Sequence, residues 1–354
     1  MATYDFIFDG LGLRHWCGGG GESSGGPMTM EQLLAGGAKA GSGEEAFSLS
    51  DVWNLPFPSL DALNAACPAI ARTRDMTRGV EQSFLSVKDG LKVVLDPLTQ
   101  PLSWLLEGAL FLFQWTPWWV MIPFLALVVY YASKSASLVG FVVGALCFLA
   151  FIDHYSFAMQ TLSIIFVCAV LCVLLGVPIG IAMSRSDGLQ RAMIPVLDML
   201  QTLPTFVYLI PLIFLFSVTE PKLYGIAIIL YAIVPVIRLT DLGIRLVDKE
   251  VIEAADAFGM TKRQKLYGVE IPLALPNIMA GVNQTIMMSL AMVVIASLVS
   301  APGLGVLVLR GIRNLELGVG LVAGLGIVLL AVILDRVTKA ALARVNAASS
   351  VPRH

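Results

Sequence analysis

The chain has 354 residues, of which 57% are hydrophobic and 14% are charged, and its mean hydropathy is +0.82. Soluble domains carry about 25% charged residues, so this composition excludes a soluble globular protein and indicates an integral membrane protein. The net charge of −2 says little about partners, because long charge-free runs separate the charged residues into groups on different sides of the expected membrane. The basic residues form no patch with stacking aromatics, which argues against nucleic-acid binding.

Residues 1–78 are predicted to form a flexible tail, because residues 17–43 are rich in Gly and Ser. The start, MATYDFIFDG, lacks a basic region and a long apolar core, so no cleavable signal peptide is expected. Cys17 and Cys67 could pair if this tail is periplasmic, although nothing in the sequence requires it.

Residues 79–116 carry an apolar stripe at helical spacing, which begins at Phe84 and Val87 and continues to Phe113. This pattern predicts amphipathic helices that lie along the membrane surface before the first crossing. A crossing at 102–115 is the alternative, but Glu107 interrupts it and 14 residues are few for a span.

Charge-free runs mark the expected crossings, since about 20 helical residues span a hydrocarbon core of roughly 30 Å. Seven such runs lie at 117–133, 135–152, 155–184, 199–219, 223–237, 271–309 and 317–334. We therefore predict an all-α integral membrane protein with about seven transmembrane helices in a domain at 117–340, followed by a C-terminal tail at 341–354. The end of the long run, 301–307, is expected to be a loop or re-entrant turn.

Several residues inside or beside these runs carry further expectations. The short run at 223–237 can extend past Arg238, whose long stem can reach the headgroups. Pro204, Pro211 and Pro235 are expected to kink their spans.

Cations beyond residue 116 fall mainly on one side of the predicted membrane. If the polar segment after residue 247 is cytoplasmic, alternation of the crossings leaves only Lys222, Arg310 and Arg313 outside. The positive-inside rule then predicts an outer N-terminus and a cytoplasmic C-terminus.

A polar island at 248–276 separates two long uncharged stretches. Asp248 is a candidate N-cap for a helix that ends at Gly259, where a residue without a Cβ adopts the left-handed conformation at low cost. One face of that helix, at i, i+3, i+4 and i+7, is formed by Val251, Ala254, Ala255 and Phe258.

Thr261, followed three residues later by Gln264, predicts a capping box that starts a second short helix. Pro272 and Pro276 are expected to stop this helix from running into the next apolar run. We name residues 248–272 the capped loop. It is predicted to be a rigid, bent knob that faces a second protein; the alternative is an ordinary cytoplasmic loop that happens to be helical.

Polar groups within the apolar runs are candidates for a solute pathway. The candidates are Asn283, Gln284, Thr285, Ser289 and Tyr208. Polar groups at membrane depth face a water-filled cavity or other helices, so helix packing is the alternative. Trp115, Trp118 and Trp119 could hold a quaternary ammonium ion, but three tryptophans at the start of a span are typical of an interfacial belt.

Catalytic signatures are absent from the sequence: there is no GxxxxGK[ST], HExxH or GxSxG motif, so no catalytic residue is predicted. His15, His154 and His354 are isolated. Cys168 and Cys172 share a helix face, but no His or carboxylate joins them at ligand spacing, so no metal site is expected.

EAADAFG at 253–259, followed by VEIP at 269–272, resembles the EAA-type loop of membrane subunits from ATP-binding-cassette importers. Three other segments, at 197–216, 236–245 and 277–312, resemble the permease of glycine betaine and proline betaine importers, a branch that includes choline permeases. The likeness covers about residues 95–340.

The resemblance implies a type I importer-like transmembrane domain in the bacterial inner membrane. Two copies would form the pathway and work by alternating access, while a periplasmic binding protein delivers the osmoprotectant. Two cytoplasmic ATPase subunits would bind ATP and Mg, so this chain would need no cofactor and would be no enzyme. The residues expected to couple to the ATPase are Glu253, Ala254, Ala255 and Gly259.

Other transport classes remain open. Permeases for taurine, nitrate and phosphonate share the same type of loop. A stand-alone secondary transporter would need internal repeats and acidic residues at the midplane, and neither stands out in the sequence. A channel would need a repeated pore-lining pattern and would leave the capped loop without a role.

Overall fold

The computed structural model describes residue 17 and residues 59–349. Within these residues the regular secondary structure is entirely helical, as the sequence predicts. The chain divides into two compact units, Met1–Gly90 and Leu91–His354. Most of the predicted flexible tail at 1–78 therefore lies outside the described residues.

The described part of the first unit contains α4 (Leu60–Ala66) and the start of α5 (Thr73–Trp115). Ser59 caps α4 by accepting a hydrogen bond from the Ala62 amide at 3.2 Å. A disulfide joins Cys17 to Cys67, and apolar side chains including Leu63 pack on it. The helix α5 is one continuous element of 43 residues, not the several helices predicted at 79–116.

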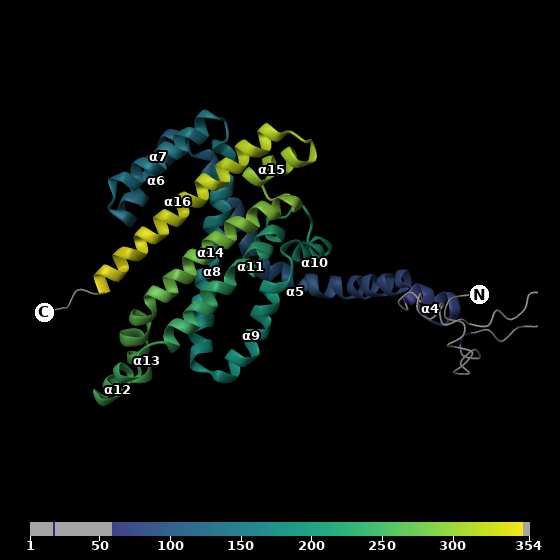
Figure 1. The fold of residues 1–354 in the computed structure, drawn as a ribbon, viewed down its shortest axis with the longest axis horizontal. Helices are drawn as coiled ribbons and strands as arrows, with labels where there is room; N and C mark the ends of the chain where they lie inside the picture. The colour runs from purple at the N-terminus through teal and green to yellow at the C-terminus, as the bar shows by residue number, and fades with distance from the viewer. Residues whose placement is uncertain (1–16, 18–58, 350–354) are drawn as a thin grey trace, which may run out of the picture. The chain divides into compact units, whose positions relative to one another are not determined.

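Three long helices form the centre of the second unit (Figure 1): α8 (Tyr155–Arg185), α11 (Pro221–Arg245) and α14 (Ile271–Ala296). The helix α11 packs against both of the others. A Cβ on Gly180 of α8 would lie 2.7 Å from the Ile237 carbonyl of α11, and one on Gly281 of α14 would lie 3.0 Å from the Val236 Cα. Small residues thus allow close backbone approach, as is typical of membrane helices.

Other helices of this unit lie around this centre. They are α6 (Trp118–Ser133), α7 (Ala136–Phe151), α9 (Asp187–Thr202), η2 (Thr205–Tyr208), α10 (Leu209–Leu215), η4 (Ser297–Val299), α15 (Leu304–Arg313) and α16 (Leu317–Ser349). The helices α6 and α7 pack against each other and against α16, while α15 packs against α16 (Figure 1).

The number of candidate membrane spans in the described residues is smaller than seven. Four helices are long and apolar enough: Tyr155–Arg185, Pro221–Arg245, Lys262–Val299 and Leu317–Arg344. The number reaches six if each of two bent pairs is one span, α5 with α6 and α9 with η2 and α10. Every predicted run contains helical structure, but α7 has 16 residues and a 106° bend separates α9 from the helical segment that follows it.

Local predictions about breaks were partly wrong. Pro204 lies at the 106° bend between α9 and η2, so it stands at a break between two helices and not within one. The segment 301–307 is a turn only up to Gly303 (φ +123°), since α15 begins at Leu304. The Leu304 amide donates to Thr161 Oγ1 at 2.9 Å, which satisfies a donor at this helix start. The last helix, α16, continues past residue 340 to Ser349.

Candidate functional site

The capped loop folds as α12 (Lys249–Ala257), α13 (Lys262–Lys265) and η3, a π-helical turn at Leu266–Glu270. Asp248 is the N-cap of α12, because its Oδ1 accepts a hydrogen bond from the Glu250 amide at 3.0 Å. This confirms the predicted start of the first helix. Figure 1 shows α12 and α13 at one extremity of the second unit, away from α15.

The bend between the two short helices is made as predicted. Gly259 has φ +75° and donates to the Asp256 carbonyl at 2.9 Å, while the Met260 amide donates to the Ala255 carbonyl at 3.2 Å. These two bonds form a Schellman motif, which satisfies the last carbonyls of α12. No other group lies within 4 Å of a Cβ built on Gly259, so its backbone conformation and not space favours glycine here.

The second helix starts with the predicted capping box of Thr261 and Gln264. Lys265 Nζ then reaches back across the bend to the Asp256 carboxylate, at 2.7 and 2.8 Å from its two oxygens. Most of the Lys265 side chain is covered, since 14% of it is exposed. The bend and this ion pair tie α12 and α13 together, which favours movement of the two helices as one body.

The outer surface of the loop is apolar and exposed. Phe258 is 86% exposed, and Val251, Met260 and Tyr267 are also exposed. Large exposed apolar side chains grouped on one knob mark an interaction surface. Glu253 and Ala254 are exposed beside them, whereas Ala255 is only 5% exposed. The methyl group of Ala255 is therefore covered in this conformation, and the expected role of Ala255 in coupling to the ATPase stays a prediction.

The predicted stop before the next apolar run is also wrong. The chain continues through η3 directly into α14, and Pro272 and Pro276 lie within that helix. The Ile271 amide bonds to the Leu266 carbonyl, an i to i−5 bond that ends the π turn just before Pro272. Proline has no amide to donate and its ring conflicts with the carbonyl four residues earlier. The wider turn is a known way to accommodate this irregularity within a helix.

Glu270 connects the loop to a second helix. Its carboxylate is buried, with 4% of the side chain exposed, and its Oε2 lies 2.6 Å from Arg185 Nη2 at the end of α8. The adjacent start of α14 is packed by an apolar cluster in which Ile271 and Ala274 contact residues of α8 and α11, including Ile181 and Ile244. An ion pair and an apolar contact thus hold the base of the capped loop.

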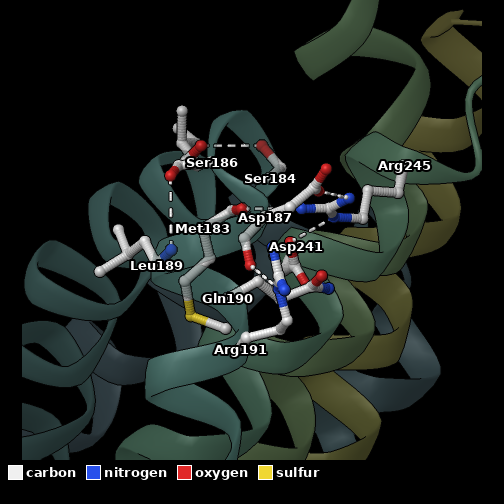
Figure 2. Close-up of polar contacts among 10 residues, drawn as sticks. Met183, Ser184, Ser186, Asp187, Leu189, Gln190, Arg191, Asp241 and Arg245 are labelled. Carbon is white, nitrogen blue, oxygen red and sulfur yellow. Dashed lines mark hydrogen bonds and ion pairs between the residues drawn. The ribbon is translucent and has the colours of Figure 1, made fainter.

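A polar cluster lies at the α8–α9 corner, and Figure 2 shows its members. We call Met183, Asp187, Gln190, Asp241 and Arg245 the Arg245 network. Arg245 donates to Asp241 Oδ1 at 3.0 Å, to Asp187 Oδ1 at 2.8 Å and to the Met183 carbonyl at 2.9 Å. Gln190 donates to Asp241 Oδ2 at 2.7 Å. The network joins α8, α9 and α11 at one point.

The candidate pathway residues are not brought together on one open surface. Gln284 is exposed, but Thr285 and Ser289 are fully buried, and Ser289 donates to the Thr285 carbonyl at 2.9 Å. Asn283 donates to Asp335 of α16 at 3.4 Å. Tyr208 is buried and donates to the Leu200 carbonyl. In this conformation most of these polar groups lie between helices.

Two charged residues in or beside the runs have specific partners. Arg238 pairs with Asp198 of α9, while the reach of its side chain to the headgroups stays a prediction. Lys222 is buried and lies 2.7 Å from Asp96 and 2.8 Å from Glu220. The pairs of Arg238 with Asp198, Lys222 with Asp96 and Arg185 with Glu270 were missed from the sequence, because the partners are far apart along the chain. A signal was present: a carboxylate inside an apolar segment, such as Glu270 in VEIPLALP, requires a cation.

Cysteines and tryptophans complete the sequence candidates. Cys168 and Cys172 are buried as free thiols, and the described residues contain no group of three metal-ligating side chains. The three tryptophans at 115, 118 and 119 are exposed on the surface.

Comparison with known proteins identifies the family. The model for binding-protein-dependent transport system inner membrane components matches residues 172–347. The glycine betaine/proline betaine transport system permease protein ProW of Escherichia coli is 38% identical over 288 residues, 81% of this chain and 80% of the relative. The glycine betaine transport system permease protein OpuAB of Bacillus subtilis is 37% identical, over 72% of this chain and 86% of the relative.

Two further matches extend the comparison. The glycine betaine/carnitine transport permease protein GbuB of Listeria monocytogenes is 39% identical over 67% of this chain and 86% of the relative. A solved inward-facing structure of the MetNI methionine ABC transporter aligns with 56% of this chain and 96% of its own, at 20% identity and a TM-score of 0.48. These relatives confirm the permease family that the sequence predicts. The chain therefore belongs to the permease family of the glycine betaine and proline betaine importers.

Proposed function

We propose that this chain is the membrane-spanning subunit of an ATP-driven importer for quaternary-ammonium osmoprotectants, and that it forms the translocation pathway by alternating access. The observation that carries the proposal is the capped loop, a rigid knob with an exposed phenyl ring at Phe258. The substrate class rests on the relatives, whose names specify glycine betaine, proline betaine and carnitine.

The capped loop supplies the contact with an ATPase subunit in this proposal. Phe258 inserts into a groove of the ATPase, while Glu253 and Ala254 line the rim of the contact. Gly259 sets the angle between α12 and α13, and Ala255 packs inside the knob. ATP and Mg²⁺ are bound by the partner, and its closure moves the knob as a rigid body.

We place the N-terminus in the periplasm and the C-terminus in the cytoplasm. The sorting of cations supports this orientation, as does the Cys17–Cys67 disulfide, since disulfides persist in oxidising compartments such as the periplasm. In intact cells, a membrane-impermeant maleimide should label the two thiols only after treatment with a reductant. Labelling without a reductant, or only after lysis, would contradict this placement.

The pathway lies between two copies of the chain in the proposed assembly, which also receives a periplasmic binding protein. Gln284, Asn283 and Tyr208 are proposed to contact solute, together with Thr285 and Ser289 when α14 moves. Of these, Gln284 is the residue that is already exposed in the single chain. Its replacement by Ala is expected to raise the KM for uptake more than replacement of the buried Ser289.

Co-expression with the candidate ATPase and binding protein tests the function directly. The permease should co-purify with the ATPase, and proteoliposomes should take up labelled glycine betaine only with ATP and binding protein present. Excess choline, proline betaine or carnitine should compete, whereas taurine and phosphonate should not. Accumulation by the permease alone would instead indicate a secondary transporter.

A further inference from the structure

An ion pair lies at the buried end of the capped loop, outside the exposed surface that is proposed to contact the ATPase. Polar contacts elsewhere in the loop, such as Lys265 with Asp256 and Thr261 with Gln264, stay within it. Glu270 differs, because its carboxylate leaves the loop and pairs with Arg185 on α8 at 2.6 Å. The carboxylate is almost completely buried, so it depends on this cation for compensation.

The position of Glu270 within its own helix makes this contact informative. It is the last residue of the π turn η3 and directly precedes α14. A π turn inside a long helix is frequently found at a functional site. Movement of α12 and α13 therefore reaches Glu270 through the π turn that joins the knob to α14.

Arg185 lies at a corner where three helices are connected. It ends α8, and Asp187 begins α9 two residues later. Asp187 and the Met183 carbonyl are both bound by Arg245 of α11. The α8–α9 corner is consequently fixed to α11, so a force applied at Arg185 acts on three helices that are held together (Figure 2).

We propose that the Arg185–Glu270 ion pair is the positioning contact that transmits movement of the capped loop to the α8–α9–α11 corner. This inference rests on the proposed function, in which the loop receives the movement of an ATPase. The pair contacts neither solute nor nucleotide in this scheme. Its role is to make the corner follow the loop, so that hydrolysis by the ATPase produces a change in the membrane helices.

The test uses the full transporter in proteoliposomes, with ATPase, binding protein and labelled glycine betaine. Uptake and ATP hydrolysis are measured in the same vesicles for Glu270→Gln, Arg185→Gln and the double variant. Each single variant is expected to lower uptake per ATP hydrolysed by about fivefold or more, the usual size of a coupling effect. The double variant should be no worse than the poorer single one, because residues that act as a unit are not additive.

The ratio of uptake to ATP hydrolysis distinguishes a loss of coupling from a loss of folded complex. A loss of folded complex lowers uptake and hydrolysis together and leaves their ratio unchanged. The double variant leaves no unpaired charge buried, so it provides the measurement if a single variant does not assemble. A matched control is Arg238→Gln with Asp198→Asn, which removes an Arg–carboxylate pair between α9 and α11 and should leave the ratio within about twofold.

Two results would overturn the inference: an unchanged ratio in the double variant, or single effects that multiply in it. Failure of the proposed function is distinguishable from either. In that case the unaltered permease would not co-purify with the ATPase, or would not take up betaine with it. If the unaltered permease couples normally and the double variant has the same uptake per ATP hydrolysed, only the role of this ion pair is rejected.

Discussion

The capped loop and the Arg245 network both belong to the second unit but are held together in different ways. The polar contacts within the loop join residues two to nine positions apart, such as Asp248 with Glu250 and Lys265 with Asp256. The contacts of the network with α8 and α9 join residues 51 to 62 positions apart. The loop is therefore a locally determined shape, whereas the network exists only when three helices are already packed.

This difference indicates a division of roles. A part that keeps its shape through its own caps can be pushed without losing its structure, and it can present a constant surface to a partner. A part held by contacts between helices changes when those helices move. Substitutions in the two regions should therefore separate docking from stability.

The largest expected effect is at the α8–α11 contact on which the network depends. Gly180→Val places a side chain against the Ile237 carbonyl and should destabilise the permease by about 3 kcal/mol, as overpacking does. Thermal unfolding in detergent measures the loss. Gly144→Val on α7 is the matched control, because a Cβ there meets nothing within 4 Å. Equal losses would show that close helix approach is not the cause.

Arg245→Gln should have the next largest effect, because it leaves Asp241, which is 6% exposed, with only the Gln190 amide. We expect a loss of about 2 kcal/mol, less than for a fully buried pair because the Arg245 side chain is 30% exposed. Arg191 is an exposed arginine on the same face of α9 as Asp187. Its replacement, Arg191→Gln, should change the free energy of unfolding by no more than about 0.5 kcal/mol. If both changes lowered stability by a similar amount, Arg245 would contribute no more to stability than an exposed arginine does.

Gly259→Asp should affect docking more than stability. The left-handed backbone at this position costs a residue with a Cβ about 1.5 kcal/mol, although the surrounding space is open. We expect normal insertion but weaker co-purification with the ATPase and reduced uptake. Gly268 lies in η3, where a Cβ also meets nothing within 4 Å, so Gly268→Asp should retain more co-purification and more uptake than Gly259→Asp. Full uptake by the Gly259 variant would contradict the role of the bend.

Thr261→Ala should have the smallest effect, because it removes a capping box at the surface, which is worth about 1 kcal/mol. The loss is expected to stay local, so the melting temperature should not change. Hydrogen exchange should be faster at the amides of the α13 start, and Thr261→Ser should restore protection. Faster exchange in distant helices would show that the loop is not determined locally.

The sequence predicted the loop well because its rules act over a few residues. Asp248, Gly259 and the Thr261–Gln264 pair all have the predicted roles, since backbone dihedrals and capping bonds depend on neighbours. The all-helical membrane class follows equally from composition and run length. The exact ends of the spans do not follow from run length, since the charge-free run 199–219 contains the 106° bend between α9 and η2.

Predictions failed where a distant residue decides the outcome. The sequence gives no direct information that Arg238 meets Asp198, or that Arg185 meets Glu270. Pro272 was read as a stop, yet the π turn before it allows the helix to continue. In one case a local pattern was available: Asp241 and Arg245 have the i, i+4 spacing of a helical ion pair.

The π turn at Leu266–Glu270 also makes the number of residues matter more than their identity. Each residue of an ordinary helix advances the chain by about 100° around the axis. Removing one residue from this turn would rotate everything before it relative to α14, so that Phe258 would point in another direction while both neighbouring helices stayed intact. Substitutions at exposed Tyr267 or Gly268 should accordingly be tolerated far better than a single deletion there.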